Sequence, residues 1–143
     1  MNTVTLARNA MATRFEIVLH GDNPVALRAA GEEALTEIEK LEDRLSLFRP
    51  HSEIAHVNAR AAREPVRVTP EVFGLLERAY QLHTETQGTF DITIAPLMRA
   101  WGFQLGGGKP PPPEVLESAR TVTGMRLVHL DPANFTVRFE KPG

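Results

Sequence analysis

One long run with helical periodicity constrains the fold of this chain more than any other feature. Asn23 and Pro24 form a helix cap followed by a proline suited to the first helical turn. From there, apolar or small residues recur at spacings of three and four: Leu27, Gly31, Ala34, Ile38, Leu41, Leu45 and Phe48. The pattern predicts an amphipathic helix over residues 24–48, which Arg49-Pro50 brings to an end.

The remaining surface of this helix is strongly acidic, and we interpret it as a solvated face. Its acidic residues are Glu32, Glu33, Glu37, Glu39, Glu42 and Asp43. In the whole chain of 143 residues, 42% are hydrophobic and 24% charged, which is typical of one soluble globular domain. A net charge of -2 gives no reason to expect nucleic acid as a partner. The absence of cysteine excludes disulfides, thiolate nucleophiles and cysteine-based zinc sites.

The other predicted elements surround this helix in the sequence. Strands are expected at residues 4–8 and 15–20, 66–68, 126–130 and 135–139, the 66–68 strand at a sheet edge. Helices are expected at residues 53–58, capped by Ser52, from Thr69-Pro70 onward, and at residues 113–122. Val72, Phe73, Leu76, Ala79, Tyr80 and His83 are expected on the inner face of the helix after Thr69. The order of these elements predicts an α+β fold with helices packed on a largely antiparallel sheet. No sheet partners are expected for the last hairpin, which suggests a chain that stops early.

A second informative stretch follows the Thr69-Pro70 helix. Gly88 is a natural left-handed helix stop, and Pro96 suits the first turn of another helix. Between them, Asp91 lies on a tight connection, where a carboxylate either caps its own turn or meets a ligand. The capping interpretation also buries Trp101 and Phe103, and both interpretations remain open from the residues alone.

Histidine and glycine patterns give no further site. The five histidines show no metal-ligand spacing, and we interpret His83 as half-buried and hydrogen-bonded rather than as a ligand. The glycines and prolines of residues 104–113 predict a loop, and Gly106 to Lys109 lack the spacing of a phosphate-binding loop. The best candidates, Met11, Phe48 and residues 89–91 (Thr89, Phe90 and Asp91), all lie at ends of regular elements.

Three motifs follow one another along the chain: residues 10–17 around Met11, residues 45–54 with Asn58, and residues 88–91 leading to Pro96-Leu97 and Trp101-Gly102-Phe103. Together they resemble the ApbE family. The chain departs from the family in Ala12, where many members have glycine, and in Phe48, where tyrosine is common. The resemblance implies that residues 1–143 are the N-terminal part of a single ApbE-like domain, incomplete at the C-terminus.

The resemblance also implies a function, that of an FAD:protein FMN transferase. Such an enzyme moves FMN from FAD to a threonine or serine hydroxyl of a target flavoprotein and releases AMP. Met11, Phe48, Thr89, Phe90 and Asp91 would then contact the flavin nucleotide. Mg²⁺ would take part, with its ligands mostly beyond residue 143. This chain alone is therefore expected to be an incomplete enzyme. No catalytic residue is assigned. The alternatives are a flavin-binding or FAD-hydrolysing relative and an inactive fragment.

The amino terminus bears on localisation. Residues 1–8 lack the basic and apolar regions of a signal peptide, and no run of about 18 apolar residues could span a membrane. The sequence as it stands predicts a cytoplasmic protein. A periplasmic lipoprotein whose leader has been removed is the alternative.

Overall fold

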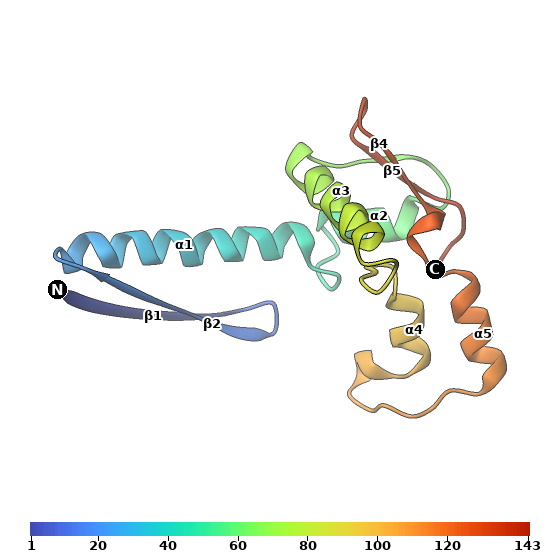
Figure 1. Ribbon diagram of the computed structural model, residues 1–143, viewed down its shortest axis with the longest axis horizontal. Coiled ribbons are helices and arrows are strands. Elements are labelled where there is room, and N and C mark those ends of the chain that lie inside the picture. The colour runs from blue at the N-terminus through green and yellow to red at the C-terminus, as the bar shows by residue number, and fades with distance from the viewer. The chain divides into compact units, whose positions relative to one another are not determined.

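The computed structural model describes residues 1–143, the side chain of Leu105 excepted. The chain divides into two compact units, Met1–Ala55 and His56–Gly143 (Figure 1). All strand pairs are antiparallel, and the α+β class is confirmed. The strands form a two-stranded sheet, β1-β2, and a three-stranded sheet, β3-β5-β4, rather than one sheet.

The first unit is a β-hairpin alongside a long helix. Strands β1 (Asn2–Ala10) and β2 (Thr13–Gly21) pair over their full length, from Asn2 opposite Gly21 to Ala10 opposite Thr13. Both strands were predicted, and both extend further than their β-forming residues indicated. Helix α1 (Pro24–Leu45) runs beside them (Figure 1).

Helix α1 begins where its cap predicts. The Asn23 side-chain oxygen accepts hydrogen bonds from the N–H groups of Val25 and Ala26, both at 3.1 Å, and Pro24 occupies the first turn. The predicted end at Phe48 is wrong, because the helix stops at Leu45 and Ser46 is extended. The Ser46 hydroxyl accepts a hydrogen bond from the Phe48 N–H at 3.2 Å, and this local bond competes with a further helical turn.

The apolar face of α1 packs on the hairpin through Leu35. This side chain is 1% exposed and forms a core cluster with Val4 and Leu6. Phe15, Ile17, Leu27 and Ile38 pack against that cluster. The prediction placed Ala34 on this face, which is wrong, because Ala34 is exposed and Leu35 is buried. Leu41 is only partly buried.

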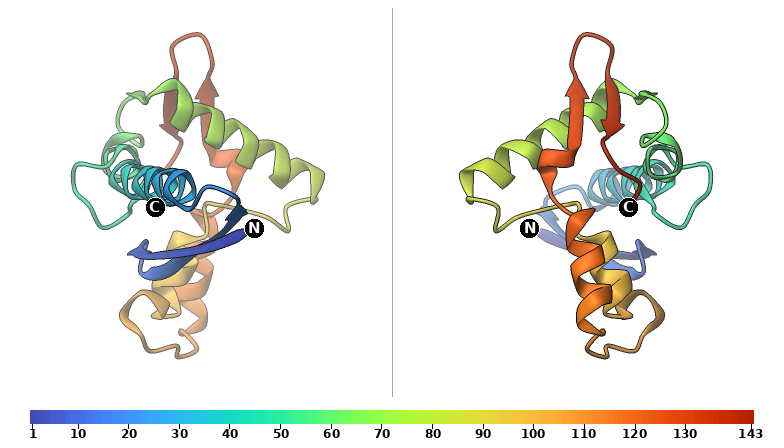
Figure 2. Two further views of the ribbon diagram at one scale, coloured as in Figure 1. Left: turned by 90° about the vertical axis from the view of Figure 1, so that its left-hand side faces the viewer. Right: turned by 90° about the vertical axis from the view of Figure 1, so that its right-hand side faces the viewer.

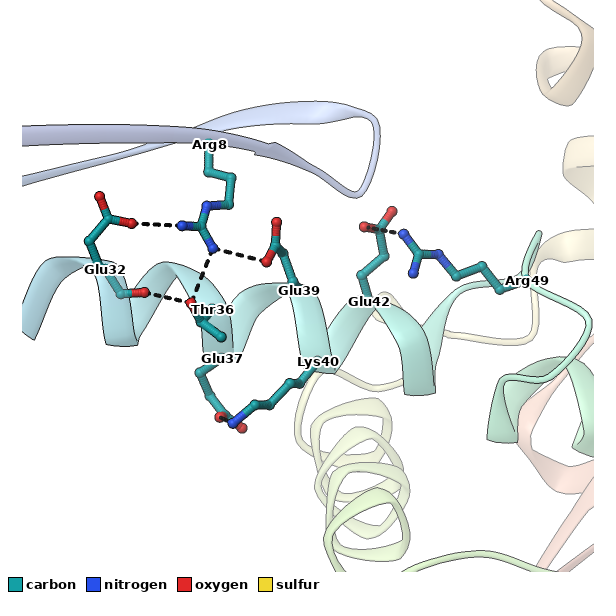
Figure 3. A network of polar contacts seen from close by, with 8 residues as sticks. All are labelled: Arg8, Glu32, Thr36, Glu37, Glu39, Lys40, Glu42 and Arg49. Carbon is teal, nitrogen blue, oxygen red and sulfur yellow. Dashed lines mark hydrogen bonds and ion pairs between the residues drawn. The ribbon is translucent and has the colours of Figure 1, made fainter.

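Part of the acidic face of α1 is bonded to the hairpin rather than purely solvated. The Arg8 guanidinium of β1 donates to Glu32 at 2.7 Å, to Glu39 at 2.9 Å and to the Thr36 hydroxyl at 3.1 Å (Figure 3). The carboxylates of Glu32 and Glu39 are each 49% exposed, so these pairs are largely solvated. Exposed ion pairs contribute little each, but three bonds from one guanidinium fix the hairpin along the helix.

The second unit contains the remaining helices and the three-stranded sheet. Helix α2 (Glu53–Arg60) crosses the division between the units and is followed by β3 (Val66–Arg67) and α3 (Pro70–Glu85). Next come α4 (Ala95–Ala100), the short 3-10 helix η1 (Phe103–Leu105) and α5 (Pro113–Thr121). The 3-10 helix η2 (Met125–Leu127), β4 (Val128–Asp131) and β5 (Thr136–Phe139) complete the unit. Helices α4 and α5 lie side by side (Figure 1).

Helix α3 lies across the hairpin of β4 and β5 (Figure 2). Phe73, 1% exposed, meets the ring of Phe135 edge-on at 5.5 Å. Strand β3 pairs with β5 through Val66 and Val137 and forms the predicted sheet edge. The hairpin therefore has a sheet partner, contrary to the expectation. Tyr80, predicted on the inner face of α3, is 44% exposed.

Among the described residues, no helix combines the length and apolarity needed to cross a membrane.

The packing of α1 gives a stability prediction. Leu35→Ala should destabilise the protein by about 2–5 kcal/mol, because it removes a fully buried side chain and leaves a cavity. Leu41→Ala should cost less, because Leu41 already meets solvent. Urea denaturation of the two variants measures the difference. If Leu41→Ala destabilises the protein as much as Leu35→Ala or more, the assignment of Leu35 to the buried face of α1 is wrong.

The β4–β5 turn gives a pH prediction. Hydrogen bonds from the Asn134 side chain and the Ala133 N–H lower the pKa of Asp131 below its usual 3.8. A lowered folded-state pKa stabilises the fold above the unfolded-state value, and this stabilisation is lost as pH falls through the folded-state value. The stability gap between the parent and Asn134→Ala should therefore be larger at neutral pH than at a pH well below 3.8, where Asp131 is protonated in both the folded and the unfolded state. Urea denaturation of both proteins at neutral and at low pH measures this difference. A stability difference that does not change with pH would contradict the prediction.

Candidate functional site

In the first unit, the hairpin loop borders a cavity. The cavity has a volume of about 510 Å³ and is lined by residues 9–14 together with Glu42 and Arg49. Met11, one of the predicted site residues, occupies the loop and is 42% exposed. Met11 and Ala12 have φ angles of 50° and 57°, so both residues of this two-residue turn are left-handed. A hairpin turn of this kind matches the twist of the strands but is normally made by asparagine and glycine.

Glu42 connects the loop to the segment that follows α1. One carboxylate oxygen accepts a hydrogen bond from the Met11 N–H at 3.0 Å. The other accepts from the Arg49 guanidinium at 2.9 Å (Figure 3), and Arg49 also contacts Asp43. The Glu42 side chain is 18% exposed, which makes it far more enclosed than Glu32 or Glu39. The sequence interpretation missed Glu42 because it grouped this residue with the solvated acidic face.

Phe48 lies in the bend between α1 and α2. It is 79% exposed, and it is not among the residues that line the cavity beside Met11. The bend is held at its base by Ser52, whose hydroxyl donates to the Ser46 carbonyl at 2.5 Å and accepts from the Ala55 N–H at 2.9 Å. The predicted cap of α2 by Ser52 is confirmed, and it holds the loop that carries both Phe48 and Arg49.

In the second unit, the predicted site residues follow the end of α3. Gln87 and Gly88 both adopt left-handed backbone, with φ of 53° and 83°, and the Gly88 N–H donates to the His83 carbonyl at 2.8 Å. The predicted stop at Gly88 is thus confirmed, although the non-glycine Gln87 shares it. Thr89 and Phe90 lie on the surface of this turn, and Phe90 is 40% exposed.

Asp91 is the most enclosed of the predicted site residues, with a side chain that is 13% exposed. One carboxylate oxygen accepts from the Thr93 N–H at 2.7 Å and from the Thr93 hydroxyl at 2.6 Å. The Thr93 hydroxyl oxygen in turn accepts from the Gly124 N–H at 2.7 Å. Asp91 therefore caps its own turn with one oxygen, as the capping interpretation predicts. The residue at the N-cap of α4 is Ile94.

His83 lies against the same turn. Its Nδ1 is 2.9 Å from the Phe90 carbonyl oxygen and 3.5 Å from the second Asp91 oxygen. A carbonyl only accepts, so Nδ1 carries a proton in this geometry. The side chain is 26% exposed, and the interpretation of His83 as a half-buried, hydrogen-bonded histidine is confirmed. Its bond to Phe90 holds the backbone beside Asp91.

The aromatic pair after α4 differs from the capping interpretation. Trp101 and Phe103 stack at 5.9 Å with their planes 7° apart. Trp101 is partly buried, but Phe103 is 52% exposed, so the expected burial of Phe103 is wrong.

A second cavity lies in the second unit, between α3 and β4. It has a volume of about 430 Å³, and it is lined by Glu77, Tyr80, Gln81, Val128, His129, Leu130 and Pro132. None of the predicted site residues belongs to it.

Comparison with known proteins identifies the family. The model of the ApbE family matches residues 11–143. The chain belongs to the ApbE family. Two relatives, both FAD:protein FMN transferases, come from Chlamydia muridarum and Treponema pallidum. The Chlamydia relative is 32% identical over 78% of this chain and 36% of its own length. The Treponema relative is 30% identical over 87% of this chain and 34% of its own length.

Solved ApbE structures have the same fold as this chain. The ApbE protein of Thermotoga maritima has a TM-score of 0.86 and 26% identity, covering 96% of this chain and 45% of its own. A variant of the flavin transferase ApbE of Vibrio cholerae has a TM-score of 0.85 and 26% identity, covering 99% of this chain and 47% of its own. The chain thus spans less than half the length of the ApbE proteins described here.

The ApbE resemblance implies Mg²⁺, which acidic side chains would hold. Among the described residues, no three such side chains gather closely enough to hold a metal ion. Asp91 and His83 form a pair only, and His83 Nδ1 is bonded to Phe90. The side chains described in this chain therefore do not make a magnesium site by themselves.

Thr93 gives a prediction about the turn that carries Asp91. Thr93→Val keeps the shape but removes the hydroxyl that bonds both Asp91 and Gly124. It should cost about 1–3 kcal/mol, because two partly buried polar groups lose a partner. Thr93→Ser keeps the hydroxyl and should cost less than Thr93→Val. Thermal or urea denaturation measures both, and equal costs for the two variants would show that the hydroxyl is unimportant.

Proposed function

We propose that this chain is part of an FAD:protein FMN transferase, and that Met11, Phe48, Thr89, Phe90 and Asp91 contact the flavin nucleotide. The proposal rests chiefly on one observation, the family match over residues 11–143 together with relatives of that name at 32% and 30% identity. The activity, FAD and the acceptor protein come to this chain by that likeness.

The proposed reaction moves FMN onto a protein hydroxyl. The oxygen of an acceptor threonine or serine attacks the phosphorus of the FMN half of FAD. The bond between that phosphorus and the bridging pyrophosphate oxygen breaks, AMP leaves, and the hydroxyl proton passes to a base or to water. Phosphoryl transfer of this kind depends on positioning and on stabilising negative charge, so a binding surface that holds FAD still contributes directly to the rate.

The side chains at the proposed positions suit a flavin nucleotide. The Phe48 and Phe90 rings are 79% and 40% exposed and so present apolar faces that a planar ring system can cover. The Met11 thioether is polarisable and adapts to an aromatic neighbour. Thr89 adds a hydroxyl. Asp91 has one oxygen bonded to Thr93, and its second oxygen, 3.5 Å from His83 Nδ1, has further capacity to accept from a polar ligand atom.

Mg²⁺ belongs to the proposed reaction as the group that would neutralise charge on the phosphates. We assign no ligand for it within this chain, since the described side chains do not gather into a metal site.

The test is a reaction of the complete gene product with FAD, Mg²⁺ and a peptide or protein bearing an acceptor threonine or serine. We expect FMN covalently attached to the acceptor, seen by mass spectrometry, with one AMP released for each FMN transferred. Free FMN and AMP in equal amounts, with no modified acceptor, would favour FAD hydrolysis and overturn the transferase proposal. Absence of any FAD turnover would favour an inactive protein.

Asp91→Asn tests the binding role of this carboxylate, because it keeps the size and the hydrogen bond to Thr93 but removes the charge. Loss of a charge-assisted bond of about 1–3 kcal/mol should weaken FAD binding by about 5- to 150-fold. FAD titration measures the affinity, and thermal denaturation measures the stability in parallel.

Asp131→Asn is the matched control for Asp91→Asn. Asp131 accepts from the N–H of the residue two positions later, Ala133, just as Asp91 accepts from Thr93. The control should leave FAD affinity unchanged. If Asp91→Asn also leaves affinity and stability unchanged, Asp91 has only its local turn-capping role.

A further inference from the structure

The Met11–Ala12 turn is strained and needs support from outside the hairpin. Both residues carry a Cβ and both have positive φ, a combination that non-glycine residues rarely adopt. The ladder of β1 and β2 closes at the Ala10–Thr13 pair, which leaves the Met11 N–H without a partner on the opposite strand. Strained turns of this kind persist only where the surroundings hold them, and they concentrate at binding sites.

Glu42 supplies that support from α1. Its first carboxylate oxygen accepts from the Met11 N–H at 3.0 Å. Its second oxygen is held by the Arg49 guanidinium at 2.9 Å, so the carboxylate is fixed at both ends. At 18% exposure, water reaches this carboxylate less than it reaches the other carboxylates bonded to the hairpin, Glu32 and Glu39, at 49%. The same side chain lines the cavity beside Met11.

We infer that Glu42 is a positioning residue, one that holds the Met11 loop in the left-handed conformation that meets the flavin nucleotide. The inference rests on the proposed function. Glu42 acts through the Met11 backbone and not by contact with FAD, and Arg49 keeps its carboxylate aimed at the loop. Loss of Glu42 should therefore weaken the binding of FAD without slowing the transfer of FMN once FAD is bound.

Three variants test this inference in the complete gene product. Glu42→Ala removes both bonds and should raise KM for FAD about tenfold, the size expected for one lost charge-assisted hydrogen bond, with kcat within about twofold of the parent. Glu42→Gln retains an oxygen that accepts from the Met11 N–H and should recover most of the affinity. Glu39→Ala is the matched control, because it breaks a hairpin bond from the same helix away from the loop and should leave KM unchanged.

A second readout separates this inference from the proposed function. Amide hydrogen exchange at Met11 reports on the bond to Glu42 whether or not the protein binds FAD. We expect exchange at Met11 to accelerate in Glu42→Ala and to stay at the parent rate in Glu39→Ala. Unchanged exchange in Glu42→Ala overturns the positioning role itself. Faster exchange in Glu42→Ala with unchanged KM overturns the link between the positioning role of Glu42 and FAD binding. A parent protein that neither binds nor turns over FAD overturns both that link and the proposed function.

Discussion

Burial of Leu35 between Val4 and Leu6 is the interaction on which the rest of the first unit depends. It fixes the hairpin along α1, and the bonds from Arg8 hold the same alignment at the rim. Glu42 follows Leu35 by seven residues, which is about two helical turns, so it lies on the same side of α1. The packing that buries an apolar side chain therefore also brings a carboxylate to the Met11 N–H.

The second unit orders its loop in a different way, through short polar contacts. His83 bonds the Phe90 carbonyl and Thr93 bonds Asp91, all within residues 83–93. Gly124, which is distant in sequence, bonds Thr93. The two interpretations of Asp91 do not exclude one another. A carboxylate whose first oxygen is held within its own turn has its second oxygen fixed in direction, and a ligand that binds to it meets a preorganised group.

The sequence predicted those features that depend on local chemistry. Asn23 with Pro24 and Ser52 begin helices through bonds to residues two or three positions later, as predicted. Gly88, also predicted as a stop, follows the end of α3 and bonds back to the His83 carbonyl. The class of fold followed from the order of elements. The motifs around Met11 and Asp91 resembled the ApbE family, and the family comparison confirms that membership.

Features that depend on distant parts of the chain were not predictable. Ala34 and Leu35 are both apolar neighbours on one helix, and only contact with Leu6 decides which of them is buried. The turn at Met11 lacks the glycine from which a hairpin turn could have been predicted. Glu42 is chemically identical to its exposed acidic neighbours, and only the Met11 N–H and Arg49 distinguish it.

Under the proposed function, the Met11 loop and the turn at residues 89–91 would each contact the flavin nucleotide. The most direct measurement is an NMR titration of the isotope-labelled chain with FAD, following backbone amides. We expect shifts at Met11 and Ala12 and at Phe90 and Asp91, with none at His129 in the cavity between α3 and β4. Shifts confined to that cavity, or saturating FAD that perturbs neither loop, would contradict it.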